Sequence, residues 1–253
     1  MSVHFNPRSR EVYLRLPSPH NQIIITPHRP DQVEETAAVL TNILNDPGVY
    51  PWLEGPPYPY LHENGKEWVL SQCRATEPVV RALQTEFESS VSREIQPFFD
   101  ICPFTCIREI QEEGCDGHPL KDTLIGDIGL SRYLFYEHPV GSEERAAAQQ
   151  RNNAFLAGNE GIVWGLGDFL KPSHHGHGIM TYAMRTLISN WGVPRMNIHD
   201  LRSSAFVENQ GSLKVFEKNN FERICTLNDW SPVSESRGGG RRSIVVVRWR
   251  GPV

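Results

Sequence analysis

Residues 162–178 have the sequence Ile162-Val-Trp-Gly-Leu-Gly-Asp-Phe-Leu-Lys-Pro-Ser-His-His-Gly-His-Gly178. The apolar run up to Leu170 predicts a strand, which ends at Lys171 because the proline that follows cannot donate to a ladder. A helix is predicted from residue 179 to residue 191, since Met, Ala, Met, Leu and Ile recur on one side of it at helical spacing. The segment is therefore a strand, a glycine-rich turn and a helix in succession.

The turn between the predicted strand and helix has the features of a phosphate-binding loop. Gly176 and Gly178 let the backbone approach a ligand closely, and the free N–H groups at the start of a helix attract phosphate oxygens. Glycine pairs of this kind are also common in ordinary turns, so the pattern alone is weak. Residue 181 is a threonine rather than a third glycine, and no Gly-Lys-Ser/Thr follows, which excludes the dinucleotide fingerprint and the nucleoside-triphosphate loop.

Strand-like and helix-like segments alternate irregularly on both sides of this stretch. Further strands are predicted at residues 22–26, 104–110, 124–130 and 196–201, with a final pair around Ile224 and residues 243–249. Further helices are predicted after Asp31, over residues 63–92 with an interruption near Pro78, and over residues 209–219. This order favours class α/β (α+β), with one mixed sheet and helices on both of its faces.

The expected domain occupies residues 22–250 and has two additions. Residues 1–21 are rich in Pro and Arg and are predicted to form a loose N-terminal arm. Residues 133–158 are predicted to be an insert, for which an added helix and a mobile flap are both consistent with the sequence. A length of 253 residues allows one or two domains. We expect one, because the strand and helix signals form a single series.

The composition excludes several classes of protein. Lys and Arg number 25 against 30 Asp and Glu, and the net charge of −5 argues against a nucleic-acid partner. No apolar run approaches the roughly 20 residues of a membrane span, so no membrane partner is expected. Five cysteines are too few, and odd in number, for a disulfide scaffold. A reducing compartment is therefore favoured, and we expect the cytoplasm, with the nucleus left open.

A second motif lies downstream of the turn, and the two together resemble a known family. Residues 208–221 are Glu208-Asn-Gln-Gly-Ser-Leu-Lys-Val-Phe-Glu-Lys-Asn-Asn-Phe221. They resemble the segment Asn-x-x-Ser/Ala-x-x-Leu-Tyr-x-Lys-x-Gly-Phe of the GNAT acetyltransferase superfamily, and residues 170–178 resemble its pyrophosphate loop. One helix and one strand fit between the motifs, as in that family. The Pro-Tyr-Pro-Tyr stretch that ends at Tyr60, followed by Glu67-Trp68, is similar to the branch of the ribosomal-protein alanine acetyltransferases.

The resemblance implies a single GNAT-like domain, with a mixed, mostly antiparallel sheet flanked by helices and a splayed strand at the CoA site. The co-substrate would be acetyl-CoA, no metal would be needed, and the acceptor would be a primary amine on a small molecule, a protein N-terminus or a lysine. Such a protein would be a monomer or a homodimer. The implied cofactor-binding residues are Phe169 and Leu170 for the pantetheine arm, Ser173, His174, His175, Gly176, His177 and Gly178 for the pyrophosphate, and Asn209 and Ser212 for the far end of the cofactor.

Two positions depart from the family pattern and bear on catalysis. Ser173 stands where Arg or Gln is usual, and Phe216 stands where a Tyr often protonates the departing thiolate. In an active enzyme, Ser212 or water would have to supply that proton. Asp168 is the candidate general base, because it lies two residues before Leu170 and on the same strand face; a hydrogen-bonded structural aspartate is the alternative. The departures keep open a second hypothesis, in which the domain binds CoA or another ligand without catalysis.

The histidine cluster in the turn also invites a metal-binding interpretation. His174, His175 and His177 are close in sequence, but adjacent histidines point apart and metal sites usually add well-placed Cys or carboxylate ligands. Pairing with phosphate or exposure to solvent is the favoured explanation. Cys102 and Cys106 do not have the spacing of a zinc ribbon, so we expect both to be buried as small hydrophobic residues.

Aromatic and charged residues elsewhere have two explanations each. Trp52, Tyr58 and Tyr60 in the proline-rich loop would either line an acceptor pocket or pack on the core. The arginines between 237 and 250 would either bind the cofactor's phosphates or an acidic partner, or remain solvated on a hairpin. The mild acidity of the whole chain suits a cationic amine acceptor.

Overall fold

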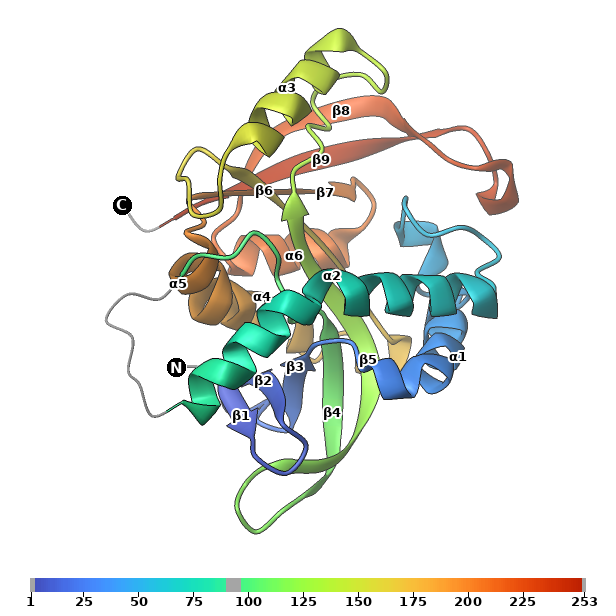
Figure 1. Ribbon diagram of the computed structural model, residues 1–253. Helices are drawn as coiled ribbons and strands as arrows, with labels where there is room; N and C mark the ends of the chain where they lie inside the picture. Colours follow the sequence, from blue (N-terminus) through green and yellow to red (C-terminus); the bar gives the residue numbers. More distant parts are fainter. Residues whose placement is uncertain (1–2, 90–96, 252–253) are drawn as a thin grey trace.

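Nine strands form one open sheet in the computed structural model, which describes residues 3–89 and 97–251 (Figure 1). The order across the sheet is β1-β2-β3-β4-β5-β6-β7-β9-β8, and every neighbouring pair is antiparallel except β6 and β7. This confirms a single domain with a mixed, mostly antiparallel sheet. The strands are β1 (His4–Asn6), β2 (Glu11–Arg15), β3 (Ile23–Thr26), β4 (Cys106–Glu113), β5 (Pro119–Arg132), β6 (Val163–Leu170), β7 (Asp200–Phe206), β8 (Glu222–Pro232) and β9 (Arg241–Arg250).

Helices cover both faces of the sheet, because the central strands carry apolar side chains on both faces. Cys106 and Leu124 pack against α1 (Val33–Leu44) and the first half of α2 (His62–Glu88). Their neighbours Ile107 and Ile125 point to the opposite face and join the cluster that contains α4 (Ile179–Leu187). The remaining helices are α3 (Glu143–Ala154), α5 (Val193–Met196) and α6 (Gln210–Lys218), with a π-helical turn at Ile188–Gly192 and short 3-10 turns at Pro30–Gln32, Tyr50–Trp52, Pro172–His174 and Glu235–Arg237.

The parallel pair β6 and β7 diverges in the middle of the sheet. Its ladder consists of three residue pairs, from Val163↔Asp200 to Gly165↔Arg202. Beyond them, β6 continues to Leu170 alongside β5, while β7 continues to Phe206 alongside β9. Ser203 donates a hydrogen bond from its hydroxyl to the carbonyl of Leu166 across the opening, at 2.7 Å. The two strands therefore separate into a V, as expected of a splayed strand.

The N-terminal segment is part of the sheet, so the expectation of a loose arm is wrong for its described residues. β2 pairs with β3, and β1 pairs with β2. Val12 and Leu14 are fully buried, and Leu16 is nearly so. These three apolar side chains occupy alternate positions along β2 and just after it, and all enter the main core. Their burial stabilises the strand despite the Pro and Arg residues around them.

Three other expectations are corrected or resolved. α2 continues through Pro78 as one helix, and residues 90–92 of the expected range lie outside the described residues. The strand expected from Met196 begins at Asp200, because Asn197 adopts a left-handed conformation (φ 55°) at the end of α5. The segment 133–158 contains a helix, α3, whose Asn152 side chain bonds to both backbone groups of Val163 on β6. In the part of the chain that the structure describes, no helix is both long and apolar enough to cross a membrane.

Candidate active site

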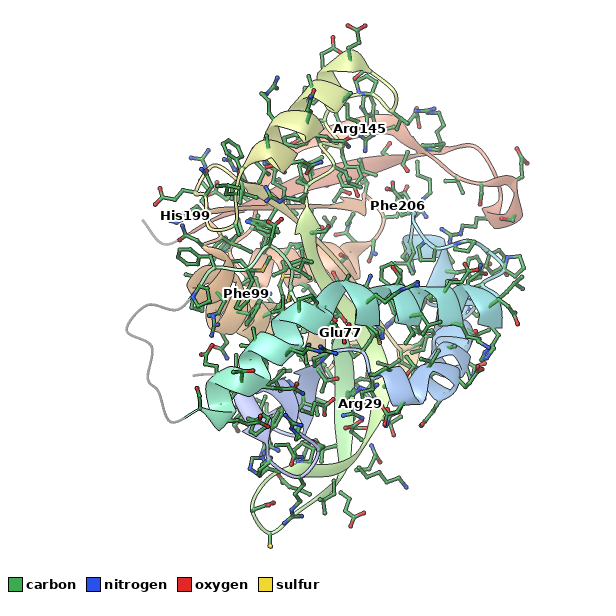
Figure 2. All side chains as sticks on the ribbon, in the orientation of Figure 1. Arg29, Glu77, Phe99, Arg145, His199 and Phe206 are labelled. Carbon is green, nitrogen blue, oxygen red and sulfur yellow. The ribbon has the colours of Figure 1, made fainter. Side chains whose placement is uncertain are left out.

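A cavity of about 820 Å³ opens where β6 and β7 diverge. Two groups of elements line it. One group consists of the end of β6, the turn 174–178, the start of α4, the end of β7 and α6. The other consists of β5, α2 and the proline-rich loop before α2. Figure 2 shows Phe206 between β9 and this loop, and the Arg242 guanidinium stacks on the rings of both Phe206 and Trp52.

The turn between β6 and α4 presents its backbone to the cavity. Gly176 (φ +77°) and Gly178 (φ +83°) are both in the left-handed region, where a side chain would strain the backbone, and both line the cavity. Gly178 is also the N-cap of α4, and no side chain caps that helix. The first N–H groups of α4 have no acceptor within the helix, so they remain available to an anion.

Two histidines of the turn, His174 and His175, have separate partners. His175 lines the cavity, and its Nε2 must carry a proton because it bonds to the Leu170 carbonyl at 2.7 Å. His174, which also lines the cavity, bonds through Nδ1 to Ser173 and lies 3.5 Å from Glu109 through Nε2. Ser173 and His177 are not among the lining residues. The three histidines therefore do not converge on one point, which argues against a metal site in this turn.

The start of α6 lies at the same cavity. Asn209 is its N-cap and accepts a hydrogen bond from the Ser212 N–H at 3.1 Å, because its short side chain folds back on the first turn. Both residues line the cavity. Phe216, one turn further along, is buried against Phe221 and also reaches the lining, but it carries no hydroxyl group. Ser212 is thus the side-chain hydroxyl that α6 brings to the cavity.

Asp168 lies in the cavity wall on β6, half-buried. Burial and the nearby charge of Asp127 raise the pKa of its carboxyl group to about 7. Among the described residues, the Asp168 carboxylate has no hydrogen-bond or ion-pair partner. A partnerless carboxyl group with a pKa near neutrality fits a proton acceptor better than a structural aspartate.

Asp127 is a second carboxylate in the wall, and it was not among the residues predicted from the sequence. It lies on β5 opposite Phe169 of β6 and opposite Cys106 of β4. Its Oδ2 atom lies 3.6 Å from Nε2 of His28, which follows β3 and is 5% exposed. Burial alone would lower the pKa of His28, but Cys106 and Asp127 raise it to about 10. A signal was present in the sequence, since Asp127 interrupts the apolar run of residues 124–130.

His28, Cys106 and Asp127 also lie close enough together to share a metal ion. Each offers one ligand atom, and these atoms lie within 4.8 Å of one another. The expectation that no metal is needed came from the family resemblance, and it stays an expectation; the three residues of this cluster are too far apart in the sequence to form a recognisable motif. Both cysteines are buried, as predicted.

The proline-rich loop is held in place by arginines of the last hairpin. Arg237 donates to the carbonyls of Leu53 and Pro56, and Arg242 donates to the carbonyl of Pro51 at 2.6 Å. These two arginines therefore bind the chain itself. Of the three aromatic residues considered in the loop, Trp52 lines the cavity, Tyr58 stacks on Tyr50, and Tyr60 is buried in the core around α1 and α2.

The family model described as Acetyltransferase (GNAT) domain matches residues 22–222. The chain belongs to the GNAT acetyltransferase family. No curated protein has a sequence significantly similar to this chain.

Solved structures share the fold at low sequence identity. An acetyltransferase of the GNAT family from Bacillus anthracis has a TM-score of 0.57 at 11% identity, covering 94% of this chain and 98% of that one. Ribosomal-protein-S5-alanine acetyltransferase from Vibrio fischeri has a TM-score of 0.55 at 13% identity, covering 90% and 93%. Mycobacterium smegmatis RimJ, solved in complex with CoA-disulfide, has a TM-score of 0.52 at 15% identity, covering 95% and 87%. The branch suggested by the sequence is thus represented among proteins of the same fold.

Proposed function

We propose that this GNAT protein is an acetyl-CoA-dependent N-acetyltransferase that acts on a primary amine. The observation that carries the proposal is the cavity between β6 and β7, in which a helix start suited to phosphate and a carboxyl group with a pKa of about 7 face the same space. The phosphate site and the proton acceptor are the two parts that this reaction needs.

The cofactor lies along the turn and α6. The N–H groups at the start of α4 bind the pyrophosphate, and Lys214 and Lys218, which also line the cavity, add positive charge on this side. The backbone of Phe169 and Leu170 lies beside the pantetheine arm. Ser173 and His177 contribute less than the resemblance implies, since neither lines the cavity.

The reaction needs few side chains. Asp168 removes a proton from the acceptor, and the amine lone pair attacks the thioester carbonyl carbon, forming the C–N bond. Backbone N–H groups stabilise the oxyanion, the C–S bond breaks, and the CoA thiolate takes up a proton. Ser212 or water passes to the thiolate the second proton, which the nitrogen loses after the attack, since Phe216 has no proton to give.

The acceptor enters from the side of β5 and the proline-rich loop, where the carboxylates lie. Asp127 on β5 and Glu54 in the loop line the cavity there, Asp168 lies on the neighbouring strand β6, and the lysines lie on α6. This separation of charge suits an anionic cofactor on one side and a cationic amine on the other. The acceptor is a small amine, a protein N-terminus or a lysine. All five cysteines are free thiols, which supports a cytoplasmic location.

A thiol-release assay with acetyl-CoA and a panel of amines and N-terminal peptides tests the proposal. Calorimetry with CoA accompanies it, and Asp168→Asn is compared with Asp31→Asn, an exposed aspartate outside the cavity. Turnover that is lost in the Asp168 variant alone supports the enzyme. CoA binding without turnover on any amine would establish the silent module instead, and absence of CoA binding would overturn both.

A further inference from the structure

Three buried side chains of the kinds that bind metals, His28, Cys106 and Asp127, lie together beside the cavity and take no part in the chemical steps above. We propose that they bind one divalent ion of the zinc type, whose fourth coordination position faces the cavity. This inference does not depend on acetyl transfer, and it departs from the expectation that no metal is needed.

Strand register brings the three side chains together. Cys106 on β4 is directly opposite Asp127 on β5, so their side chains are neighbours on the same face of the sheet. Thr26, the last residue of β3, is opposite Cys106 on its other side, and His28 follows two residues later. One ligand atom from each of the three residues lies within 4.8 Å of the other two. Backbone pairing therefore fixes the cluster, which does not rely on flexible surface side chains.

The cluster is buried, and the protein leaves several of its polar atoms without hydrogen bonds. Cys106 is fully buried, His28 is 5% exposed and Asp127 is 7% exposed. Within residues 3–89 and 97–251, both ring nitrogens of His28 and the Oδ2 atom of Asp127 have no hydrogen-bond partner. Burial of such atoms without a partner is costly, and a bound ion is one of the few ways to satisfy them.

The separation of His28 and Asp127 distinguishes a shared ion from a direct hydrogen bond. Nε2 of His28 lies 3.6 Å from Oδ2 of Asp127. A charge-assisted hydrogen bond between these groups would be about 2.7–2.9 Å long. A nitrogen and an oxygen on one tetrahedral zinc ion are about 3.3–3.5 Å apart, since each bond to zinc is about 2.0–2.2 Å long. The observed distance is closer to that of two ligands of one ion.

The donor atoms select the kind of ion. A thiolate is a poor ligand for Mg²⁺ and Ca²⁺, which prefer oxygen, whereas Cys, His and Asp are all zinc ligands. The thiolate and the carboxylate balance the two positive charges, so the loaded site is neutral and burial is tolerated. Glu54 and Asp168 remain as the other carboxyl groups that line the cavity and attract a cationic acceptor.

Three protein ligands leave one position of a tetrahedral ion open. Asp127 lines the cavity, as does Thr105, the residue before Cys106. The cavity is therefore the side from which the ion enters and on which its fourth ligand binds. Zinc sites with three protein ligands and one free position are those that bind water or substrate, whereas structural sites have four protein ligands. The reacting amine is not that ligand, since its lone pair must attack the thioester.

Metal analysis of the full chain tests the inference. After incubation with zinc chloride and gel filtration, the wild type should hold one zinc ion per chain. His28→Gln, Cys106→Ser and Asp127→Asn should each weaken zinc binding by about 100-fold or more, since even the partners behind metal ligands are typically worth about 10–100-fold. Cys115→Ser and Asp31→Asn change exposed residues outside the cluster, and these controls should bind zinc like the wild type.

Cobalt spectroscopy tests the ligands and the open position. With Co²⁺ in place of zinc, the wild type and Cys115→Ser should both show a thiolate-to-cobalt charge-transfer band, which Cys106→Ser should lack. Imidazole should shift the visible cobalt bands by occupying the fourth position. Bands that do not respond to imidazole would overturn the assignment of a position open to the cavity.

Three results would overturn the site itself. These are a wild type that retains no zinc, equal zinc contents in Cys106→Ser and Cys115→Ser, and metal-free protein in which acetyl-CoA acetylates Cys106, since that would assign a nucleophilic cysteine instead. If Cys106→Ser does not fold, Cys106→Ala replaces it, because alanine suits the apolar surroundings of this position. A wild type that holds one zinc ion but turns over no amine supports the site and refutes only the proposed function.

Discussion

Replacement of Asp168 by asparagine removes the proposed proton acceptor while keeping the shape of the side chain. The pKa of about 7 means that wild-type kcat/KM should fall about tenfold for each pH unit below 7, because only the ionised carboxyl group accepts a proton. Asp168→Asn should lower kcat by about 10²–10⁴-fold, the usual contribution of a positioned base. It should also remove the acid limb near pH 7.

The same substitution should stabilise the fold at high pH. The folded-state pKa of Asp168 is raised from 3.8 to about 7, first by burial and then by Asp127, so the folded state binds the proton more tightly than the unfolded chain. The contribution of the Asp168 carboxyl group to stability is therefore fully present below pH 4 and is lost as the pH rises towards and through 7. The loss is at most roughly 4 kcal/mol, for a pKa difference of about three units. Asparagine does not ionise, so the variant should be more stable than the wild type at pH 8 and about equally stable at pH 4.

Rates by thiol release across pH 5–9 and urea unfolding at pH 4 and pH 8 measure both effects, with Asp31→Asn as the control. Activity within threefold of wild type would refute the assignment of Asp168 as base. A variant that loses activity but gains no stability at pH 8 would show that the carboxyl group is not destabilised by burial in the free protein.

Three further substitutions address the cofactor, the leaving group and the loop. Gly176→Glu places a negative charge at the phosphate turn and should weaken CoA binding by about 10–100-fold in calorimetry. Gly117→Glu has the same positive φ and the same open space in the β4–β5 turn, so its CoA affinity should equal that of wild type, and equal weakening in both variants would contradict the phosphate turn. Ser212→Ala should lower kcat about tenfold if the hydroxyl protonates the thiolate; an unchanged kcat assigns that proton to water. Arg237→Ala releases the carbonyls of Leu53 and Pro56 and should raise KM for the amine by roughly threefold to tenfold with CoA affinity unchanged. The exposed Arg223→Ala is its control, and identical kinetics of the two would exclude a role for the loop in acceptor binding.

Much of the fold could be predicted because its signals are local. The apolar run before Lys171, the two glycines and the apolar face of the following helix lie within 30 residues of one another, and backbone preference decides their structure. The segment 1–21 shows where prediction from local signals fails. Val12, Leu14 and Leu16 alternate as strand residues do, but this signal is short and stands among Pro and Arg residues, so pairing with β3 and burial in the core decide that a strand forms.

On the proposed cofactor side of the site, too, local features could be predicted from the sequence and the direction of side chains could not. Asn209 caps its own helix and Gly178 caps α4, so each is recognisable from neighbours three or four residues away. The roles expected of Ser173 and His177 depended on where the turn points, and the folded chain leaves both outside the cavity lining.

The sequence alone predicted the strand, the glycine turn and the helix of residues 162–191, because backbone preferences within that stretch decide them, and its two motifs resemble those of the family to which the chain belongs. Only the tertiary structure decided the acceptor side. His28, Cys106 and Asp127 come from three strands or strand ends spread over 100 residues, and strand register brings them together. The pKa of Asp168 likewise depends on burial and on Asp127, and neither exists in the unfolded chain. Electrostatic effects act through distance in space, which sequence spacing does not encode.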